Sequence, residues 1–171
     1  MTNPARAGTQ TDHEQLIAAL EAVAAQIRPV ADRSGAEALP TLPTGATGDT
    51  ADTGDWTANE VMGHLCDAAR LWGARMRRVI YETNPTLTIF DENEFVQLAA
   101  YRYVPLALLA RELLLVSVGN TDFLRSLTPE QWERTGTHPE RGPLSLRAIV
   151  EIEANHEQGH LTQLKAALGE A

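Results

Sequence analysis

Residues 145–169 read SLRAIVEIEANHEQGHLTQLKAALG, and this stretch predicts a long amphipathic helix from about Ser145 to Leu168. Its apolar positions recur at the three- and four-residue spacing of a single helix face. Gly169 follows directly and is typical of a helix end. That face comprises Ile149, Ile152, His156, His160, Leu164 and Ala167. The helix therefore places two histidines on the side that faces the core.

These two histidines are candidate ligands of a metal ion. His156 and His160 stand four residues apart, so their side chains lie about one turn apart on the same face. A buried imidazole without a partner is costly, and a shared metal ion would satisfy both rings. Hydrogen bonds from the rings to carbonyls or acids of neighbouring helices are the alternative. The pair alone does not decide between the two interpretations.

The same residues, HEQGH at 156–160, match the H-E-x-x-H pattern of zinc proteases, in which the glutamate is the general base. Those enzymes usually take a third ligand well downstream, whereas only eleven residues follow His160. Glu170 is the sole residue of a ligand type among them. Glu157, adjacent to His156, points about 100° away from it on an ideal helix. The pattern therefore does not favour a protease.

A second helix, predicted over residues 57–82, supplies a third histidine. Thr57 and Glu60 have the spacing of a capping box, which marks the start of this helix. His64 falls at the edge of its inward face. Catalytic zinc and related ions take three protein ligands and keep one position open, and His64, His156 and His160 form such a set. Imidazole-rich sites accept zinc, nickel, copper or iron, so the sequence does not identify the divalent metal.

The rest of the chain is also predicted to be helical, and no window alternates as a strand. The links at residues 34–54 and 128–143 are unusually long, which permits crossovers between helices that are not nearest antiparallel neighbours. The other helical segments are predicted at Asp12–Asp32, Glu92–Tyr101, Pro105–Leu127 and the turn after Thr128-Pro129.

Composition and charge agree with a helical protein of one domain. The 171 residues are 43% hydrophobic but only 5% aromatic, which suits a helical core built from Leu, Ala, Val and Ile. We expect a single domain over residues 12–169, after a disordered N-terminus at residues 1–11. The net charge of −9 repels phosphate backbones, so nonspecific binding of DNA or RNA is disfavoured.

Cysteine usage and apolar segments bear on where the protein acts. Cys66 is the only cysteine, which excludes an internal disulfide and a multi-cysteine zinc site. We interpret it as a small buried hydrophobe. Residues 1–11 contain no apolar signal-peptide core, and the most apolar stretch, residues 104–118, is too short to span a bilayer. A cytoplasmic protein without a membrane partner is expected.

Several other polar residues have two interpretations each. Asp67 and Glu153 have the helical spacing either to orient a ligand imidazole or to be solvated acids. His138 is predicted to be a turn or packing residue, unless its loop closes over the site and contacts substrate. His13 is predicted to be exposed. Two charged clusters are first interpreted as solvated, although the acids could cap a helix and an arginine could meet an anionic substrate. These clusters are Asp91, Glu92 and Glu94, and Arg75, Arg77 and Arg78.

Two motifs together resemble the signatures of the DinB/YfiT-like superfamily. The first is EVMGHL at residues 60–65, at the start of the capped helix. The second is THPERGPLSLRAIVEIEANHEQGHLTQLK at residues 137–165, which contains an H-x-x-x-H-L-x-Q run. The resemblance extends over about residues 12–168. It implies a four-helix bundle of up-down-down-up type with a long first crossover. It also implies a three-histidine metal site on His64, His156 and His160.

The resemblance also implies what the site does. Well-understood members use the metal to activate a low-molecular-weight thiol, such as bacillithiol or mycothiol, and members often form homodimers. We therefore expect a metal-dependent enzyme for a small-molecule substrate, with thiol-dependent S-transfer preferred and hydrolysis second. Three neutral imidazoles would leave a bound ion able to lower the pKa of a water or thiol. The alternative is a non-catalytic bundle: a metal-stabilised dimer or a small-ligand-binding protein.

Overall fold

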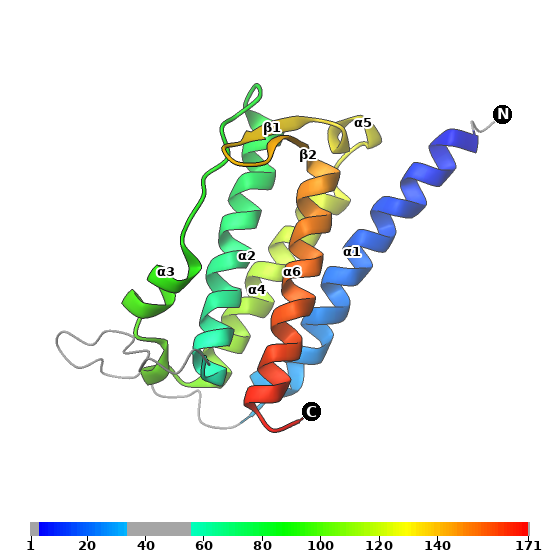
Figure 1. Cartoon of the computed structure of the whole chain (residues 1–171). Coiled ribbons are helices and arrows are strands. Elements are labelled where there is room, and N and C mark those ends of the chain that lie inside the picture. The colour runs from blue at the N-terminus through cyan, green and yellow to red at the C-terminus, as the bar shows by residue number, and fades with distance from the viewer. Residues whose placement is uncertain (1–3, 34–55, 171) are drawn as a thin grey trace.

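The computed structural model describes residues 4–33 and 56–170, and side chains from Asp12 onward (Figure 1). These described residues form four long helices, with short helices and one hairpin in the connections between them. The long helices are α1 (Pro4–Ala31), α2 (Ala58–Tyr81), α4 (Leu106–Arg125) and α6 (Leu146–Ala167). The short elements are α3 (Glu92–Leu98), η1 (Tyr101–Tyr103), α5 (Pro129–Trp132), β1 (Thr135–His138) and β2 (Gly142–Ser145). No helix in the described ranges combines the length and apolarity needed to cross a membrane.

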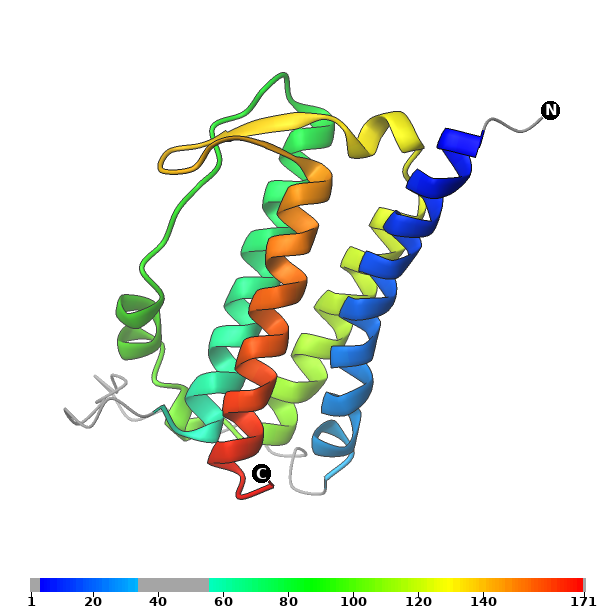
Figure 2. The same ribbon diagram turned by 45° about the vertical axis from the view of Figure 1, so that its right-hand side comes forward.

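The four long helices form an up-down-down-up bundle, as predicted. Helices α1 and α6 run in one direction, and α2 and α4 run in the other (Figures 1 and 2). Helix α2 packs against α4 and α6, and α1 packs against the same two helices. Because the neighbours α2 and α4 are parallel, residues 82–105 must return along the length of the bundle, and they carry α3 past α2. The first predicted link, residues 34–54, lies outside the described residues.

Side-chain caps define the starts of the two helices that carry the histidines. The Thr57 side chain accepts from the backbone N–H of Glu60, and the Glu60 carboxylate accepts from the N–H of Thr57 at 2.8 Å. At α6, the Ser145 hydroxyl accepts from the N–H of Ala148 at 3.2 Å. An N-cap of this kind contributes about 1 kcal/mol. Both predicted helix starts are confirmed.

Helix α1 begins earlier than predicted. The sequence predicted a helix from about Asp12 after a disordered N-terminus, but the helix starts at Pro4, so the backbone of residues 4–11 is helical. A proline suits a first helical position, because the N–H that it lacks would have no partner there. The Asp12 carboxylate instead faces Arg147 of α6 at 3.6 Å.

The prediction of no strand was wrong. Strands β1 and β2 pair antiparallel in the link between α5 and α6, with His138 opposite Gly142. Each strand has four residues, which is too short for an alternating pattern to emerge from the sequence. Gly142, with φ of 74°, adopts the left-handed conformation that closes a three-residue hairpin loop. The hairpin lies across one end of the bundle, above α2 and α6 (Figure 1).

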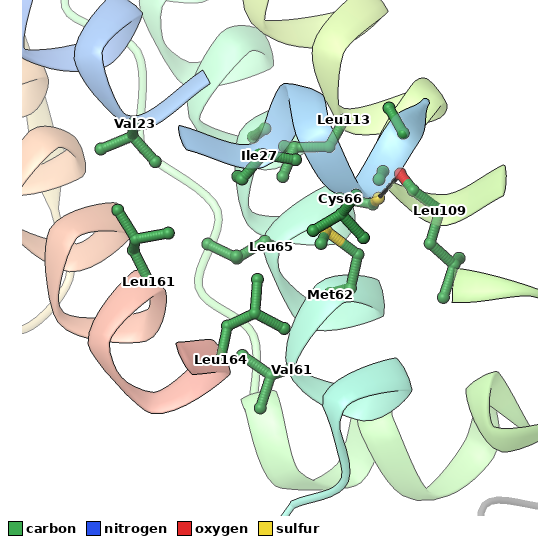
Figure 3. Packing of buried hydrophobic residues seen from close by; sticks show 14 residues of the cluster. Val23, Ile27, Val61, Met62, Leu65, Cys66, Leu109, Leu113, Leu161 and Leu164 are labelled. Carbon is green, nitrogen blue, oxygen red and sulfur yellow. Dashed lines mark hydrogen bonds between the residues drawn. The ribbon is translucent and has the colours of Figure 1, made fainter. Parts of the chain in front are cut away.

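An aliphatic core fills the bundle on the side of the α6 C-terminus (Figure 3). Its side chains are almost all fully buried, and Cys66 lies among them with its thiol donating to the Leu109 carbonyl at 3.2 Å. Burial raises the pKa of this thiol to about 12, so it is protonated and unreactive. Cys66 is therefore the small buried hydrophobe that was predicted. The core includes Val23, Ile27, Val61, Met62, Leu65, Leu109, Leu113, Leu161 and Leu164.

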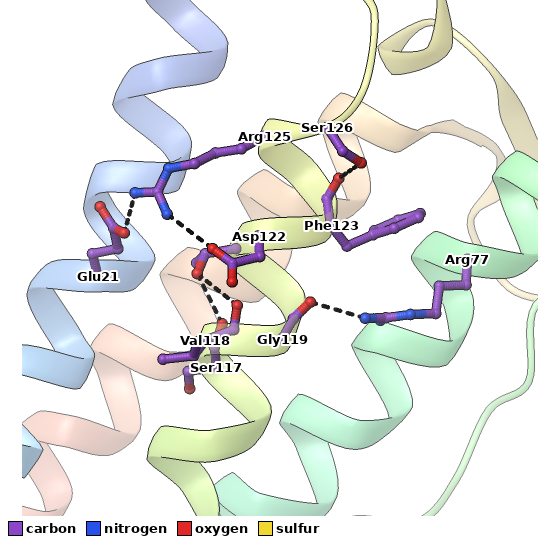
Figure 4. A network of polar contacts seen from close by, with 10 residues as sticks. Glu21, Arg77, Ser117, Val118, Gly119, Asp122, Phe123, Arg125 and Ser126 are labelled. Atoms are coloured by element: carbon purple, nitrogen blue, oxygen red, sulfur yellow. Dashed lines mark hydrogen bonds and ion pairs between the residues drawn. The ribbon is translucent and has the colours of Figure 1, made fainter.

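Polar contacts on α4 add to this packing (Figure 4). Arg125 of α4 pairs with Glu21 of α1 and lies 3.5 Å from Asp122. Arg77 of α2 donates to the carbonyl of Gly119 at 3.0 Å. Exposed ion pairs contribute about 0–1 kcal/mol each, so these contacts orient helices that the apolar core holds together.

Gly63 of α2 is required by close packing. A Cβ atom added at this position would lie 2.2 Å from Cγ of Tyr101. We expect Gly63→Ala to lower the free energy of unfolding by about 1–2 kcal/mol, because overpacking outweighs the helix propensity that alanine gains. Gly119→Ala is the matched control, since an added Cβ there meets nothing within 4 Å. Urea unfolding measures both, and a Gly63→Ala variant as stable as the control would contradict the packing.

Candidate metal centre

Three histidines that are distant in the sequence meet between two helices. His64 lies in the second turn of α2. His156 lies at the middle of α6 and His160 about one turn further on, and α6 runs antiparallel to α2. The Nε2 atoms of His64 and His156 are 3.1 Å apart. Ring centroids of His160 lie 4.4 Å from His64 and 4.5 Å from His156. The structure therefore brings together all three residues that the sequence singled out.

Aromatic side chains form walls around the imidazoles. The Trp56 ring lies 5.0 Å from the His64 ring and stacks on His160 at 5.8 Å between centroids. Phe90 stacks on the His64 ring at 6.4 Å between centroids. His64 is fully buried, whereas the His156 side chain keeps 23% of its surface exposed. The cluster is thus dry on the bundle side and open toward His156.

The rings of His64 and His156 are neutral at physiological pH. Burial, followed by the charges of the other histidines, lowers the pKa of His64 to about 3. Burial, followed by the charge of His160, lowers the pKa of His156 to about 4. A neutral imidazole carries a lone pair on one nitrogen, which is the form that binds a metal.

The tautomer of His160 is fixed by a neighbour on its own helix. Nδ1 of His160 lies 2.8 Å from Oε1 of Gln163. An amide oxygen only accepts, so Nδ1–H donates and the lone pair of His160 is on Nε2. The Nδ1 atoms of His64 and His156 are buried and have no hydrogen-bond partner among the described residues. The glutamine is the last residue of the H-x-x-x-H-L-x-Q run, so the motif itself marks this position.

Glu92 is a fourth group of ligand type at this site. Its Oε2 atom lies 3.6 Å from Nε2 of His64 and 3.8 Å from Nε2 of His156. One ligand atom from each of the four residues can be chosen so that these four atoms all lie within 4.8 Å of one another. Ligand atoms about 2.1 Å from a tetrahedral ion are about 3.4 Å apart, so a cation could bind here with small adjustments. The donor set therefore fits a divalent metal ion.

The sequence did not predict the position of Glu92. It was interpreted with Asp91 and Glu94 as solvated surface or as a helix cap. The cap is Asp91, whose side chain accepts from the backbone N–H groups of Asn93 and Glu94. Glu92 is 47% exposed and lies beside the histidines only because residues 82–105 return along α2. No local pattern encodes that path.

A groove leads from this cluster along the bundle. It has a volume of about 1010 Å³ and lies between α2, residues 88–95, the hairpin and α6. His156 and Glu92 line one end, and His138 lines the other. Trp72 and Phe90 supply apolar walls. A small organic molecule therefore has access to the histidine cluster from this side.

The sequence left two interpretations open for each of two acids, Asp67 and Glu153. Asp67 neither orients an imidazole nor is simply solvated: it accepts from the Tyr101 hydroxyl and from Arg70. Glu153 is 1% exposed, with no hydrogen-bond partner for Oε2 among the described residues. Burial and the neighbouring Glu157 raise its pKa. It is therefore a buried acid, and no described hydrogen bond joins it to the three histidines.

Glu157 and His13 complete these comparisons. Glu157 is 4% exposed, and burial raises its pKa to about 7. It is not among the clustered ligand groups, which agrees with the predicted turn away from His156. The prediction that His13 is exposed was wrong. The residue is only 6% exposed, and its ring stacks on Trp132 at 4.2 Å between ring centroids. The tertiary partner that covers it is 119 residues away in the sequence.

The chain belongs to the DinB superfamily, because the model of that family matches residues 35–164. A solved structure with the same fold is YfiT from Bacillus subtilis, described as a probable metal-dependent hydrolase with an unusual four-helix bundle topology. The two structures have a TM-score of 0.72 at 21% identity, covering 93% of this chain and 89% of YfiT. The family predicted from the two motifs is thereby confirmed.

This chain spans about two thirds of the length of the curated relatives that it matches. A candidate metal-dependent hydrolase of Oceanobacillus iheyensis is 31% identical over 109 residues, or 64% of this chain and 63% of the relative. One of Halalkalibacterium halodurans is 25% identical over 113 residues, or 66% of each chain. These relatives are described as metal-dependent, and the present chain has a His/Glu cluster that could hold a divalent ion.

Proposed function

We propose that this protein is a metal-dependent hydrolase of small molecules, with the ion held by His64, His156 and His160. The observation that carries the proposal is the convergence of two neutral imidazoles, His160 and one carboxylate at the end of an open groove. A divalent cation bound there would act as a Lewis acid and lower the pKa of water. The relatives described as metal-dependent hydrolases support the same reaction class.

The side chains around the histidines have separate tasks in this proposal. Gln163 accepts from Nδ1–H of His160 and so holds Nε2 toward the site. Trp56 covers the rings of His64 and His160, and Phe90 covers His64 from the side of the groove. Glu92 is the one carboxylate of the cluster, and its Oε2 atom is placed to accept a proton from a water molecule that enters by the groove.

Glu92 also gives the second candidate function its support. A structural zinc site is closed by four protein ligands, whereas a catalytic site keeps one position open. With Glu92 as a permanent fourth ligand, the site would be a closed, non-catalytic one that stabilises the bundle. The Glu92 side chain is 47% exposed and lies on a seven-residue helix. Both features favour a side chain that can move, and they disfavour a permanent ligand. We therefore prefer the hydrolase.

Thiol-dependent S-transfer, preferred from the resemblance, remains an alternative for the same open position. Cys66 does not supply a thiol, because it is buried in the core with a raised pKa. An external thiol would have to enter through the groove. Homodimer formation and the identity of the metal, whether zinc, nickel or iron, likewise remain predictions.

The experiment begins with protein purified without a histidine tag. Elemental analysis gives the bound metal, and the protein is then stripped and reloaded separately with zinc, nickel and iron. Each form is assayed on simple esters and amides, with and without added low-molecular-weight thiols. Metal-dependent turnover without thiol supports the hydrolase, and turnover only with thiol would replace it with the transferase. Stoichiometric metal without either activity would favour the closed structural site.

Removal of the Gln163 carbonyl should weaken the metal site without abolishing it. We expect Gln163→Leu to lower metal affinity by about 10- to 100-fold, the usual cost of losing the partner of a ligating histidine. Gln158→Leu is the matched control, because Gln158 lies exposed on the same helix. Competition with a fluorescent chelator measures both affinities. Equal affinities would contradict the role of Gln163.

A further inference from the structure

The hairpin end of the groove, opposite the histidines, is lined by basic side chains. Arg75 comes from α2, His138 from the end of β1, and Arg141 from the hairpin loop. Among the described residues, neither arginine forms an ion pair with a carboxylate. From the sequence, Arg75 and His138 had separate interpretations, each with substrate contact as the alternative. The fold places both residues at one end of one groove.

Arg75 is an unusual arginine because it is buried without a counterion. It is 5% exposed, its guanidinium lies 4.5 Å from the Trp72 ring, and its Nε donates to the Thr88 carbonyl at 2.8 Å. Burial lowers the pKa of Arg75, and the charge of Arg141 lowers it further, so the two guanidinium groups repel each other. A buried charge is costly unless an opposite charge compensates it. An anion between these two groups would supply that compensation.

His138 adds a neutral donor beside the two arginines. Its Nδ1 atom accepts from the backbone N–H groups of Glu140 and Arg141 at 3.2 and 3.3 Å. In the neutral ring the proton is therefore on Nε2, which can donate to a ligand. Burial, followed by the charges of Arg75 and Arg141, lowers the pKa of His138, and the charge of Glu140 opposes this shift.

The acids that line the groove do not neutralise this end. Asp67 is bound to Arg70 and to Tyr101, and Asp91 caps α3. Glu92 lies against the histidines at the other end. Glu94 and Glu140 remain: Glu94 is exposed on α3, and Glu140 is exposed on the hairpin loop. The groove thus has a candidate cation site at one end and, at the other, two arginines with no carboxylate in ion-pair contact among the described residues.

We propose that Arg75, His138 and Arg141 bind the carboxylate or phosphate of an elongated substrate whose reacting bond lies at the histidine cluster. This inference rests on the proposed function for the reaction but not for the binding. His64 and Arg75 are eleven residues apart on α2, so their backbones are separated by about 16 Å along the helix axis. The substrate is therefore an extended organic anion with its charge several bonds away from the reacting group.

The binding test uses the full-length, metal-loaded protein and two probes, glutarate and inorganic phosphate, in isothermal titration calorimetry. Arg141→Gln should weaken binding of the preferred anion by about tenfold or more, the effect of losing a charge-assisted contact. Arg147→Gln is the control, because it makes the same charge change on an exposed arginine outside the groove. The affinity ratio of the two probes distinguishes a carboxylate site from a phosphate site.

Two results would overturn the proposal: no saturable binding of either anion, or equal affinities in the two variants. A kinetic comparison separates this outcome from failure of the proposed function. Of two p-nitrophenyl esters, one neutral and one with a terminal carboxylate, only the charged ester should show a raised KM in Arg141→Gln. Anion binding without ester turnover would contradict the proposed hydrolase but support the anion site. Equal changes in KM for both esters would contradict the anion site.

Discussion

His156→Ala is expected to abolish stoichiometric retention of a divalent metal and all metal-dependent turnover. The variant removes one of three imidazoles that converge on one point, and it leaves two imidazoles and the half-exposed Glu92, a set too weak to keep the ion through dialysis. Loss of a partner behind a ligand already costs about 10- to 100-fold in affinity, so loss of the ligand itself should exceed about a hundredfold. Elemental analysis after dialysis against a mild chelator gives the metal content.

The control for this variant removes a histidine elsewhere. His13→Ala takes away a ring that stacks on Trp132 and lies outside the cluster, so its metal content should equal that of the native protein. Thermal unfolding with excess metal separates binding from folding, since a ligand of the native state raises Tm by mass action. Added metal should raise Tm in the native protein and in His13→Ala. An equal rise in His156→Ala would show that the ion binds elsewhere.

The sequence predicted those parts of the site that depend on local geometry. The helical period places His156 and His160 one turn apart, and the capping box at Thr57 fixes where the helix of His64 begins. The up-down-down-up topology came from the resemblance, because periodicity does not say which helices are neighbours. Once α2 and α6 are known to pack antiparallel, His64 near the start of α2 and His160 near the end of α6 come to the same level of the bundle, with His156 one turn away.

The parts that sequence reasoning missed depend on long-range packing. Glu92 lies in the connection between α2 and α4, and His138 and Arg141 lie in the connection between α4 and α6. Both connections contain only short helices and strands. The burial of His13 depends on Trp132, and the environment of Arg75 depends on Arg141 in a distant hairpin. Each contact joins residues far apart in the chain. A single sequence carries no periodic signal for contacts of this kind.

Glu92→Gln is expected to lower metal-dependent hydrolysis by about 10²- to 10⁴-fold while leaving the metal content close to that of the native protein. The amide keeps the size of the carboxylate and can still contact the site, but it does not accept a proton from water at neutral pH. Glu94→Gln is the matched control, because it makes the same charge change on the exposed surface of the same short helix. Turnover under saturating metal gives the comparison.

Glu92→Ala then separates the two roles that the geometry allows. If the carboxylate serves as the base, this variant should match Glu92→Gln in turnover and retain its metal through the three histidines. If it is instead a permanent fourth ligand, metal affinity should fall in Glu92→Ala, and no turnover should be lost because none exists in the native protein. Native turnover that persists in both Glu92 variants at full metal occupancy would exclude the residue from catalysis. The reaction would then depend on the three histidines and a water molecule from the groove, without help from the one carboxylate that faces them.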